Sequence, residues 1–278
     1  MLLEFVTDAK IPVGKTARAG FDWLEANATV FFDILSSGFE SLIDGILWAL
    51  QIPHPFLVIA GIAGFSFWLR RKLKTVILVV VGFLFILNQG YWEETTETLA
   101  LVMTSCLICM GSGVPIGIFA AHRPRLYSLL RPVLDLMQTL PTFVYLIPAI
   151  VFFGIGMVPG LIATVIFVLP APIRLTHLGI SETPQEMLEA ADAFGASRYQ
   201  KLLTVELPSA LPQIMVGLTQ TIMLSLSMVV IAALVGADGL GVPVVRALNQ
   251  VNAALGFESG LVIVVLAILL DRIFRTGK

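Results

Sequence analysis

Two groups of residues have types and spacings that support chemistry in other proteins. Cys106 and Cys109 form a C-x-x-C pair, the spacing of thiol–disulfide exchange. The pair lies inside a long apolar run with no strand before it, so we interpret it as two residues packed on one helix. Gly14-Lys15-Thr16 resembles the end of a phosphate-binding loop, but that pattern requires glycine at position 9, where the chain has Ala9. We therefore expect neither a redox centre nor a nucleotide site in this chain.

The other candidates for chemistry also lack the required spacing. His54, His122 and His177 are far apart and do not have metal-ligand spacing. The chain offers no Ser/His/Asp arrangement and no phosphate cradle, which argues against a membrane-embedded enzyme. The sequence predicts no catalytic residue, no metal and no cofactor held by this chain itself.

The polar stretch over residues 181–208 is the longest mixed polar and charged run between two strongly apolar segments. It predicts an excursion from a membrane into water. Thr183-Pro-Gln-Glu186 is a capping box with proline at the first helical position, where the missing N–H costs nothing. The helix that follows is expected to reach about Phe194, and Gly195 suits the left-handed residue that ends it.

A second short helix is expected directly after this glycine. Ser197-Arg-Tyr-Gln200 has the pattern of another capping box, and Leu207-Pro208 is expected to end the helix that it opens. The stretch therefore predicts two short helices that meet at an elbow near Gly195.

The elements on either side of this loop must be membrane helices. Hydrophobic residues make up 57% of the 278 positions and charged residues only 13%, outside the range of soluble domains. The predicted fold is all-α, a polytopic membrane helical bundle of about seven spans, each near the roughly 20 residues needed to cross. The spans are expected at about 53–69, 75–91, 97–120, 132–153, 158–179, 213–236 and 258–271.

The positions of the basic residues orient these spans. Of the 17 Lys and Arg residues, thirteen lie in loops or span ends on the side of residues 181–208, whereas the opposite loops hold only Arg246. The positive-inside rule therefore places the polar loop in the cytoplasm. The thirteen are Arg70, Arg71, Lys72, Lys74, Arg123, Arg125, Arg131, Arg174, Arg198, Lys201, Arg272, Arg275 and Lys278.

Residues 28–50 form a separate amphipathic segment. Acidic and hydroxyl side chains recur at steps of three and four from Asp33 to Asp44, which predicts a helix with a narrow acidic face. It could lie along the membrane surface or span with its acids facing other helices. We favour the surface, because each acid near the bilayer centre costs about 2.5–3.5 kcal/mol.

The loop residues resemble a known family. Glu189-Ala190-Ala191, then Gly195 four positions later, then Val205-Glu206-Leu207-Pro208, is similar to the EAA loop of ABC importer permeases, with pattern EAA-x3-G-x9-I-x-LP and Val205 in place of isoleucine. In that family the loop is the cytoplasmic coupling helix seated in a cleft of the ATP-hydrolysing subunit. The resemblance implies that the ATPase-coupling residues are Glu189, Ala190, Ala191, Phe194, Gly195, Leu207 and Pro208.

A narrower resemblance covers about residues 90–275. The runs Asp135-Leu-Met-Gln-Thr-Leu-Pro141, Phe153-Gly-Ile-Gly156 and Gly239-Leu-Gly241 look like the glycine betaine/proline betaine/choline subfamily. This implies a type I importer of the bacterial inner membrane with a quaternary ammonium solute. Its implied partners are a second copy of the permease, two ATPase subunits that bind ATP and Mg, an external binding protein and the lipid bilayer, with no nucleic acid.

Aromatic residues in the expected fourth span give a modest hint about the substrate path. Quaternary ammonium groups bind aromatic faces, which makes Phe143 and Tyr145 candidates beside Phe152 and Phe153. Pro148 breaks the helix there, as suits a helix that lines a path. Simple packing of these aromatic residues remains the stronger interpretation. Nearby, Asp135 is expected to pair with a basic residue such as Arg174.

Two alternatives remain at this point. A secondary transporter would show inverted repeats and usually a buried charge, and neither is evident. A permease for another small solute is the alternative within the importer class. The expected organisation is a tail and amphipathic surface helix over residues 1–50, and a transmembrane permease domain over residues 51–278 that carries the coupling loop 182–208.

Overall fold

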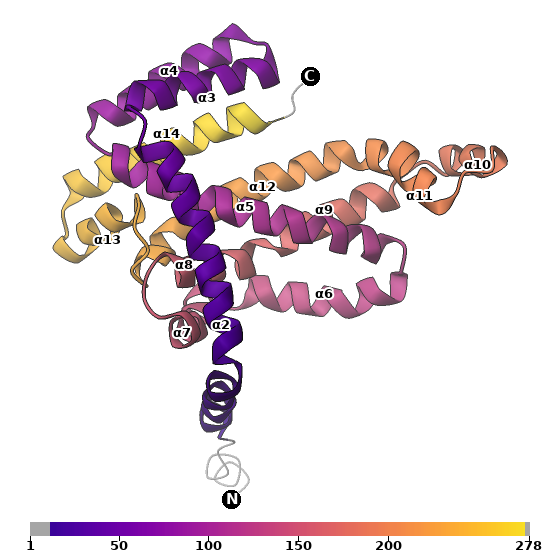
Figure 1. Cartoon of the computed structure of the whole chain (residues 1–278), viewed down its shortest axis with the longest axis horizontal. Coiled ribbons are helices and arrows are strands. Elements are labelled where there is room, and N and C mark those ends of the chain that lie inside the picture. The colour runs from indigo at the N-terminus through magenta and orange to yellow at the C-terminus, as the bar shows by residue number, and fades with distance from the viewer. Residues whose placement is uncertain (1–11, 276–278) are drawn as a thin grey trace, which may run out of the picture.

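The computed structural model describes residues 12–275, and every regular element among them is a helix (Figure 1). The helices are α2 (Val13–Gln51), α3 (Pro55–Arg70), α4 (Leu73–Asn88), α5 (Trp92–Ala121), α6 (Pro124–Thr139), α7 (Thr142–Phe153), α8 (Met157–Val168), α9 (Pro170–Ser181), α10 (Gln185–Ala193), α11 (Arg198–Lys201), the π-helix η1 (Leu202–Glu206), α12 (Leu207–Ala233), α13 (Gly241–Gln250) and α14 (Ala253–Phe274). The all-α prediction is confirmed for this part of the chain.

Helices long and apolar enough to cross a membrane form the centre of the fold. Within residues 12–275 there are four, namely α5, α8 with α9, the helix from Arg198 to Ala233, and α14, or up to six if each bent pair is one span. The hairpin α3–α4, which packs on α14, has 16 residues in each helix. At roughly 1.5 Å per residue, each is shorter than the approximately 30 Å hydrocarbon core.

The expected fourth span, 132–153, consists of two helices with a sharp bend between them. The chain bends by 95° between α6 and α7. Leu140 precedes Pro141 and has an extended backbone, with φ −65° and ψ 137°, because a proline disfavours the helical conformation of the residue before it. In Figure 1, α6 extends along α5 whereas α7 is turned across it. The 132–153 segment is thus a broken element.

The N-terminal amphipathic helix is longer than expected. It extends from Val13 to Gln51, and its helical geometry is interrupted at Ala28, where the expected helix began. In Figure 1, α2 lies across the direction of α5 and α12, and it meets α3 at 104°. Ile43 is buried against Ala100 of α5 and Leu161 of α8. The position of this helix along the membrane surface stays a prediction.

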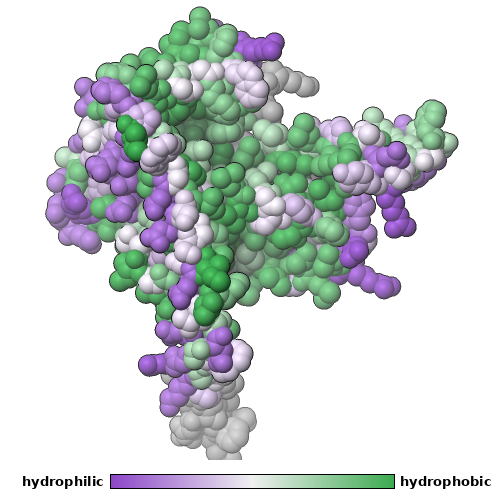
Figure 2. Space-filling model, viewed as in Figure 1, coloured by the Kyte–Doolittle hydropathy of each residue, from purple (hydrophilic) through white to green (hydrophobic). Residues whose placement is uncertain are grey.

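The surface has the polarity pattern of a membrane protein. Figure 2 shows hydrophobic side chains over most of the body, with hydrophilic side chains gathered near α13, along part of α2 and at the tip of the loop that carries α10. Exposed large hydrophobic residues include Trp68, Leu107 and Leu129, which are 72%, 60% and 72% exposed. Such side chains are stable in contact with lipid.

Close packing of α5 on α9 depends on two of the three glycines in α5. A Cβ added at Gly117 would lie 2.7 Å from the carbonyl oxygen of Ile173 and 2.7 Å from Cβ of Thr176, and one at Gly113 would lie 2.9 Å from Pro172. Gly111 has no neighbour within 4 Å of such an atom. Small residues spaced by four let two membrane helices approach closely.

Gly117→Leu is therefore expected to destabilise the fold far more than Gly111→Leu on the same helix. Overpacking against a backbone carbonyl costs about 1–3 kcal/mol or more, which corresponds to a fall in the unfolding midpoint of several degrees, roughly 2–4 °C per kcal/mol. Thermal unfolding of the detergent-solubilised protein measures this difference. Equal midpoints for the two variants would contradict the α5–α9 contact.

Candidate coupling surface

The loop between α9 and α12 turns at Gly195. This residue has φ +73°, in the left-handed region that favours glycine. The Ala196 N–H donates to the Ala191 carbonyl at 3.0 Å, and the Gly195 N–H donates to the Asp192 carbonyl at 2.9 Å. These are the two hydrogen bonds of a Schellman motif. The predicted end of the first loop helix and its glycine are confirmed.

The two predicted capping boxes have different outcomes. At Ser197 the box is present, since the Ser197 hydroxyl accepts from the Gln200 N–H and the Gln200 side chain accepts from the Ser197 N–H. At Thr183 it is absent, because Pro184 is extended and itself precedes the helix, so α10 begins one residue later than expected. The Thr183 hydroxyl is buried without a hydrogen-bond partner in the described residues.

The expected helix end at Leu207-Pro208 is wrong. The helix continues from α11 through the π-helix η1 into α12, and the Leu207 N–H donates to the Leu202 carbonyl five residues earlier. Pro208 lies in the first turn of α12, where its missing N–H is tolerated. The wider π turn thus absorbs the proline without ending the helix.

The loop presents a groove of about 650 Å³ between α10 and the segment formed by η1 and the start of α12. Phe194 stands beside it with 92% of its surface exposed, a large cost for an aromatic side chain in water. The small side chains of Ala190 and Ala191 let a partner approach the helix backbone. The groove is lined by residues from α10 and from the η1–α12 arm, including Met187, Ala190, Ala191, Phe194, Val205 and Pro208.

Three of the predicted coupling residues do not line this groove. Glu189 is exposed and accepts a hydrogen bond from the Gln185 amide at 3.2 Å. Leu207 packs inward on the cluster of Ile180, Ala210 and Ile214. Gly195 sets the backbone turn. A further link, Lys201 Nζ to Asp192 Oδ1 at 2.6 Å, joins α11 to α10. The arrangement is a stiff two-helix projection with an apolar groove.

Comparison with known proteins decides the family. The family described as "Binding-protein-dependent transport system inner membrane component" matches residues 113–275, which is more than half of the chain and includes the whole loop. The chain belongs to this family. Its predicted resemblance to ABC importer permeases is confirmed, and so is its predicted location in the inner membrane.

Individual relatives agree with the family. The permease is 47% identical over 246 residues to the glycine betaine/carnitine transport permease protein GbuB of Listeria monocytogenes, with 87% of each chain covered. It is 44% identical over 269 residues to the glycine betaine transport system permease protein OpuAB of Bacillus subtilis, covering 97% of this chain and 95% of that one.

A solved structure has the same fold. A chain of the MetNI methionine ABC transporter, in an inward-facing conformation, is 25% identical, with a TM-score of 0.59, and the match covers 69% of this permease and 96% of that chain. The fold is that of a type I ABC importer permease.

The aromatic residues suggested for the substrate path are dispersed in the permease. Phe143 is 56% exposed on α7. Phe152 stacks on Phe32 of α2 with ring centroids 4.5 Å apart, and Phe153 meets the same ring at 5.4 Å. Pro148 lies half-buried inside α7. The structure does not bring these side chains together around one space, and their role in transport stays a prediction.

Tyr145 instead contacts the end of α6. Its side chain is buried, and its hydroxyl donates to the Met137 carbonyl at 2.6 Å and lies 3.2 Å from the Leu136 carbonyl. Its ring packs in a cluster with Leu146 and Met228. The contact holds α7 at its angle to α6. The predicted Asp135–Arg174 pair lies nearby and is confirmed, with Nη2 2.6 Å from Oδ1.

Tyr145→Phe is therefore expected to lower the free energy of unfolding by about 1–2 kcal/mol, because it removes the hydroxyl that donates to the Met137 carbonyl at the end of α6. The unfolding midpoint should fall by several degrees, roughly 2–4 °C per kcal/mol, while the KM for solute uptake stays unchanged. Tyr127→Phe is the matched control, because that ring stacks on His177 without a hydroxyl contact among residues 12–275. A raised KM at unchanged stability would assign the hydroxyl to the solute.

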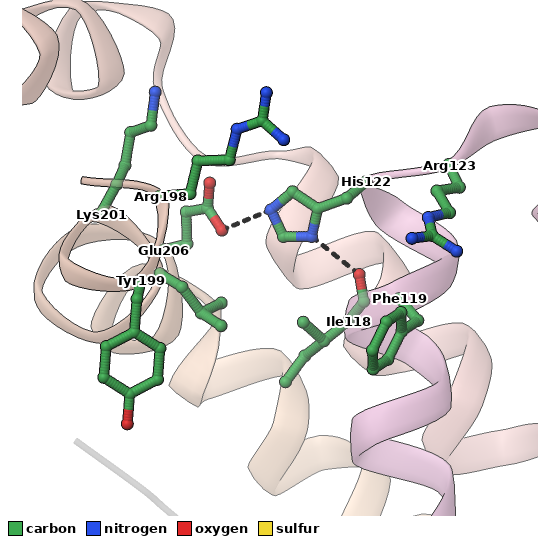
Figure 3. A pocket seen from close by; sticks show the side chains of 9 residues that line it. Ile118, Phe119, His122, Arg123, Arg198, Tyr199, Lys201 and Glu206 are labelled. Atoms are coloured by element: carbon green, nitrogen blue, oxygen red, sulfur yellow. Dashed lines mark hydrogen bonds and ion pairs between the residues drawn. The ribbon is translucent and has the colours of Figure 1, made fainter.

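Sequence reasoning missed a second cavity beside the loop. Figure 3 shows it between the end of α5 and the α11–η1 arm, with His122 directed at Glu206. Arg123, Arg198 and Lys201 line the same cavity. Glu206 occupies the variable position of the V-x-LP pattern, and His122 lies 84 residues away, so no local signal could have paired them.

Proposed function

We propose that this permease moves a quaternary ammonium solute, glycine betaine or choline, into the cytoplasm. Support comes from the relatives: GbuB is named for glycine betaine and carnitine, OpuAB for glycine betaine, and the Escherichia coli protein ProW, 41% identical over 270 residues, for glycine betaine and proline betaine. These solutes share a methylated cationic nitrogen. Transport of another small solute by the same kind of importer is the alternative.

The loop is the ATPase-coupling surface in this proposal. The observation that carries it is the groove beside Phe194, exposed by 92%, on a projection beyond the apolar body. Glu189, Ala190, Ala191, Phe194, Gly195, Leu207 and Pro208 are the coupling residues. Two ATPase subunits, each with ATP and Mg, seat the loops of two permease copies, and an external binding protein delivers the solute above.

The cycle then follows from rigid-body transmission. ATP binding closes the two ATPase subunits and carries the docked loops toward each other, which tilts the spans and opens the path outward. Hydrolysis and release reverse the movement. The stiff connections within the loop support this proposal, because a projection held by the Schellman turn and the Lys201–Asp192 pair moves as one body.

The test is uptake of radiolabelled glycine betaine and choline by membrane vesicles that hold the permease with its ATPase and binding protein. We expect uptake of at least one solute that needs internal ATP and survives collapse of the ion gradients. Excess unlabelled carnitine and proline betaine measure the breadth of recognition. Uptake that needs a gradient and no ATP would contradict the proposal and favour a secondary transporter.

A further inference from the structure

A polar contact joins the cytoplasmic end of α5 to η1 of the coupling loop. His122 is the residue that caps α5, and its Nε2 lies 2.8 Å from Oε2 of Glu206 in η1, at hydrogen-bonding distance. Its Nδ1 lies 2.9 Å from the carbonyl oxygen of Ile118, one turn back on α5. Figure 3 shows the ring held between these two oxygens.

The contact fixes the imidazole ring between two elements. Each ring nitrogen lies within hydrogen-bonding distance of an oxygen, one on η1 and one on α5. The Glu206 side chain is only 9% exposed, so loss of His122 would leave a largely buried carboxyl group without this hydrogen bond.

The pair lies on one of the connections between the coupling loop and the spans. α10 and α11 pack chiefly on each other and on η1, so apart from the backbone connection to α9, movement of the loop reaches the spans through η1. One route follows the backbone into α12, across a π turn and Pro208, where the regular helical hydrogen bonding is interrupted. The other route passes sideways through Glu206 to α5, which packs along α9 and α12.

We infer that the His122–Glu206 pair transmits movement of the coupling loop to α5, so that α5 and α12 move together. His122 and Glu206 are positioning residues in this role, and they need no contact with solute or nucleotide. The inference rests on the proposed coupling function of the loop. Without the pair, the π turn would let α11 pivot against α12 while α5 stays in place.

The test measures solute moved per ATP hydrolysed by the reconstituted permease, ATPase and binding protein. His122→Ala should lower this ratio about tenfold, a typical size for coupling between two sites, while ATP hydrolysis and copurification of the ATPase persist. The position is tolerant of truncation, because the His122 side chain is 46% exposed. His122→Arg, which keeps a hydrogen-bond donor near Glu206, should recover part of the ratio.

A double variant covers the case in which the unpaired carboxylate prevents assembly. His122→Asn with Glu206→Gln removes both the imidazole and the carboxyl group, and we expect an assembled complex with the same loss of coupling. Arg275→Ala is the matched control, because its pair with Asp271, at 3.7 Å, lies at the end of α14 and does not join two elements. It should leave the ratio unchanged.

The possible outcomes distinguish the proposed function from the role of the His122–Glu206 pair in transmission. If the unaltered complex shows no ATP-dependent uptake, the proposed function is wrong. If it couples normally and the His122→Ala or double variant matches its ratio, the transmission role is wrong while the proposed function stands. A loss of thermal stability with an unchanged ratio would likewise assign the pair to folding alone.

Discussion

Phe194→Ala is expected to detach the ATPase from the permease. Phe194 is 92% exposed and lines a groove together with Ala190 and Ala191. No packing contact within the described chain offsets the unfavourable exposure of this aromatic ring to water. Buried aromatic anchors at the centre of an interface cost about 2 kcal/mol or more when truncated, which corresponds to roughly 30-fold weaker binding. The folded permease loses no internal packing, so its own stability should not change.

Copurification and uptake together measure this effect. The Phe194→Ala permease should reach the membrane in normal amounts, bring down little ATPase and show almost no ATP-driven uptake. Phe67→Ala on α3 is the matched control, because that side chain is also exposed, by 52%, but lies on a membrane helix away from the loop. Normal ATPase recovery with Phe194→Ala would show that the aromatic side chain is not the anchor.

Gly195→Val is expected to abolish ATP-driven uptake by changing the direction of the loop. The space around Gly195 is open, since a Cβ would meet nothing within 4 Å, but its φ of +73° is strained for any L side chain and most of all for a β-branched one. The strain of about 1–2 kcal/mol falls on the Schellman turn that sets α11 against α10. The backbone is therefore expected to relax and misplace the groove.

Two controls separate backbone conformation from bulk. Gly195→Asn should retain much of the uptake, because asparagine tolerates the left-handed conformation better than other side chains. Gly61→Val adds the same side chain at a helical position with open space, and it should be harmless. Normal transport by Gly195→Val at normal expression would mean that the elbow does not set the coupling geometry.

The sequence by itself determined the membrane class and predicted the cytoplasmic side of the loop and its coupling role, because each of these signals is local or additive. Apolar composition and the bias of basic residues report on whole segments. Gly195 and the Ser197 capping box act through backbone contacts within five residues, so their types and spacing are enough to predict them.

Only the tertiary structure decided the features that depend on distant contacts or on competition between local preferences. Pro141 predicts a break in the fourth span but not the 95° bend between α6 and α7, and Tyr145, a candidate for the solute path, turns its hydroxyl to α6 as a result. Pro208 was expected to end a helix, yet a π turn accommodates it. The His122–Glu206 pair joins residues 84 positions apart, and no spacing rule reaches across that distance. Packing of whole helices, which fixes such contacts, is not encoded in any short stretch of the chain.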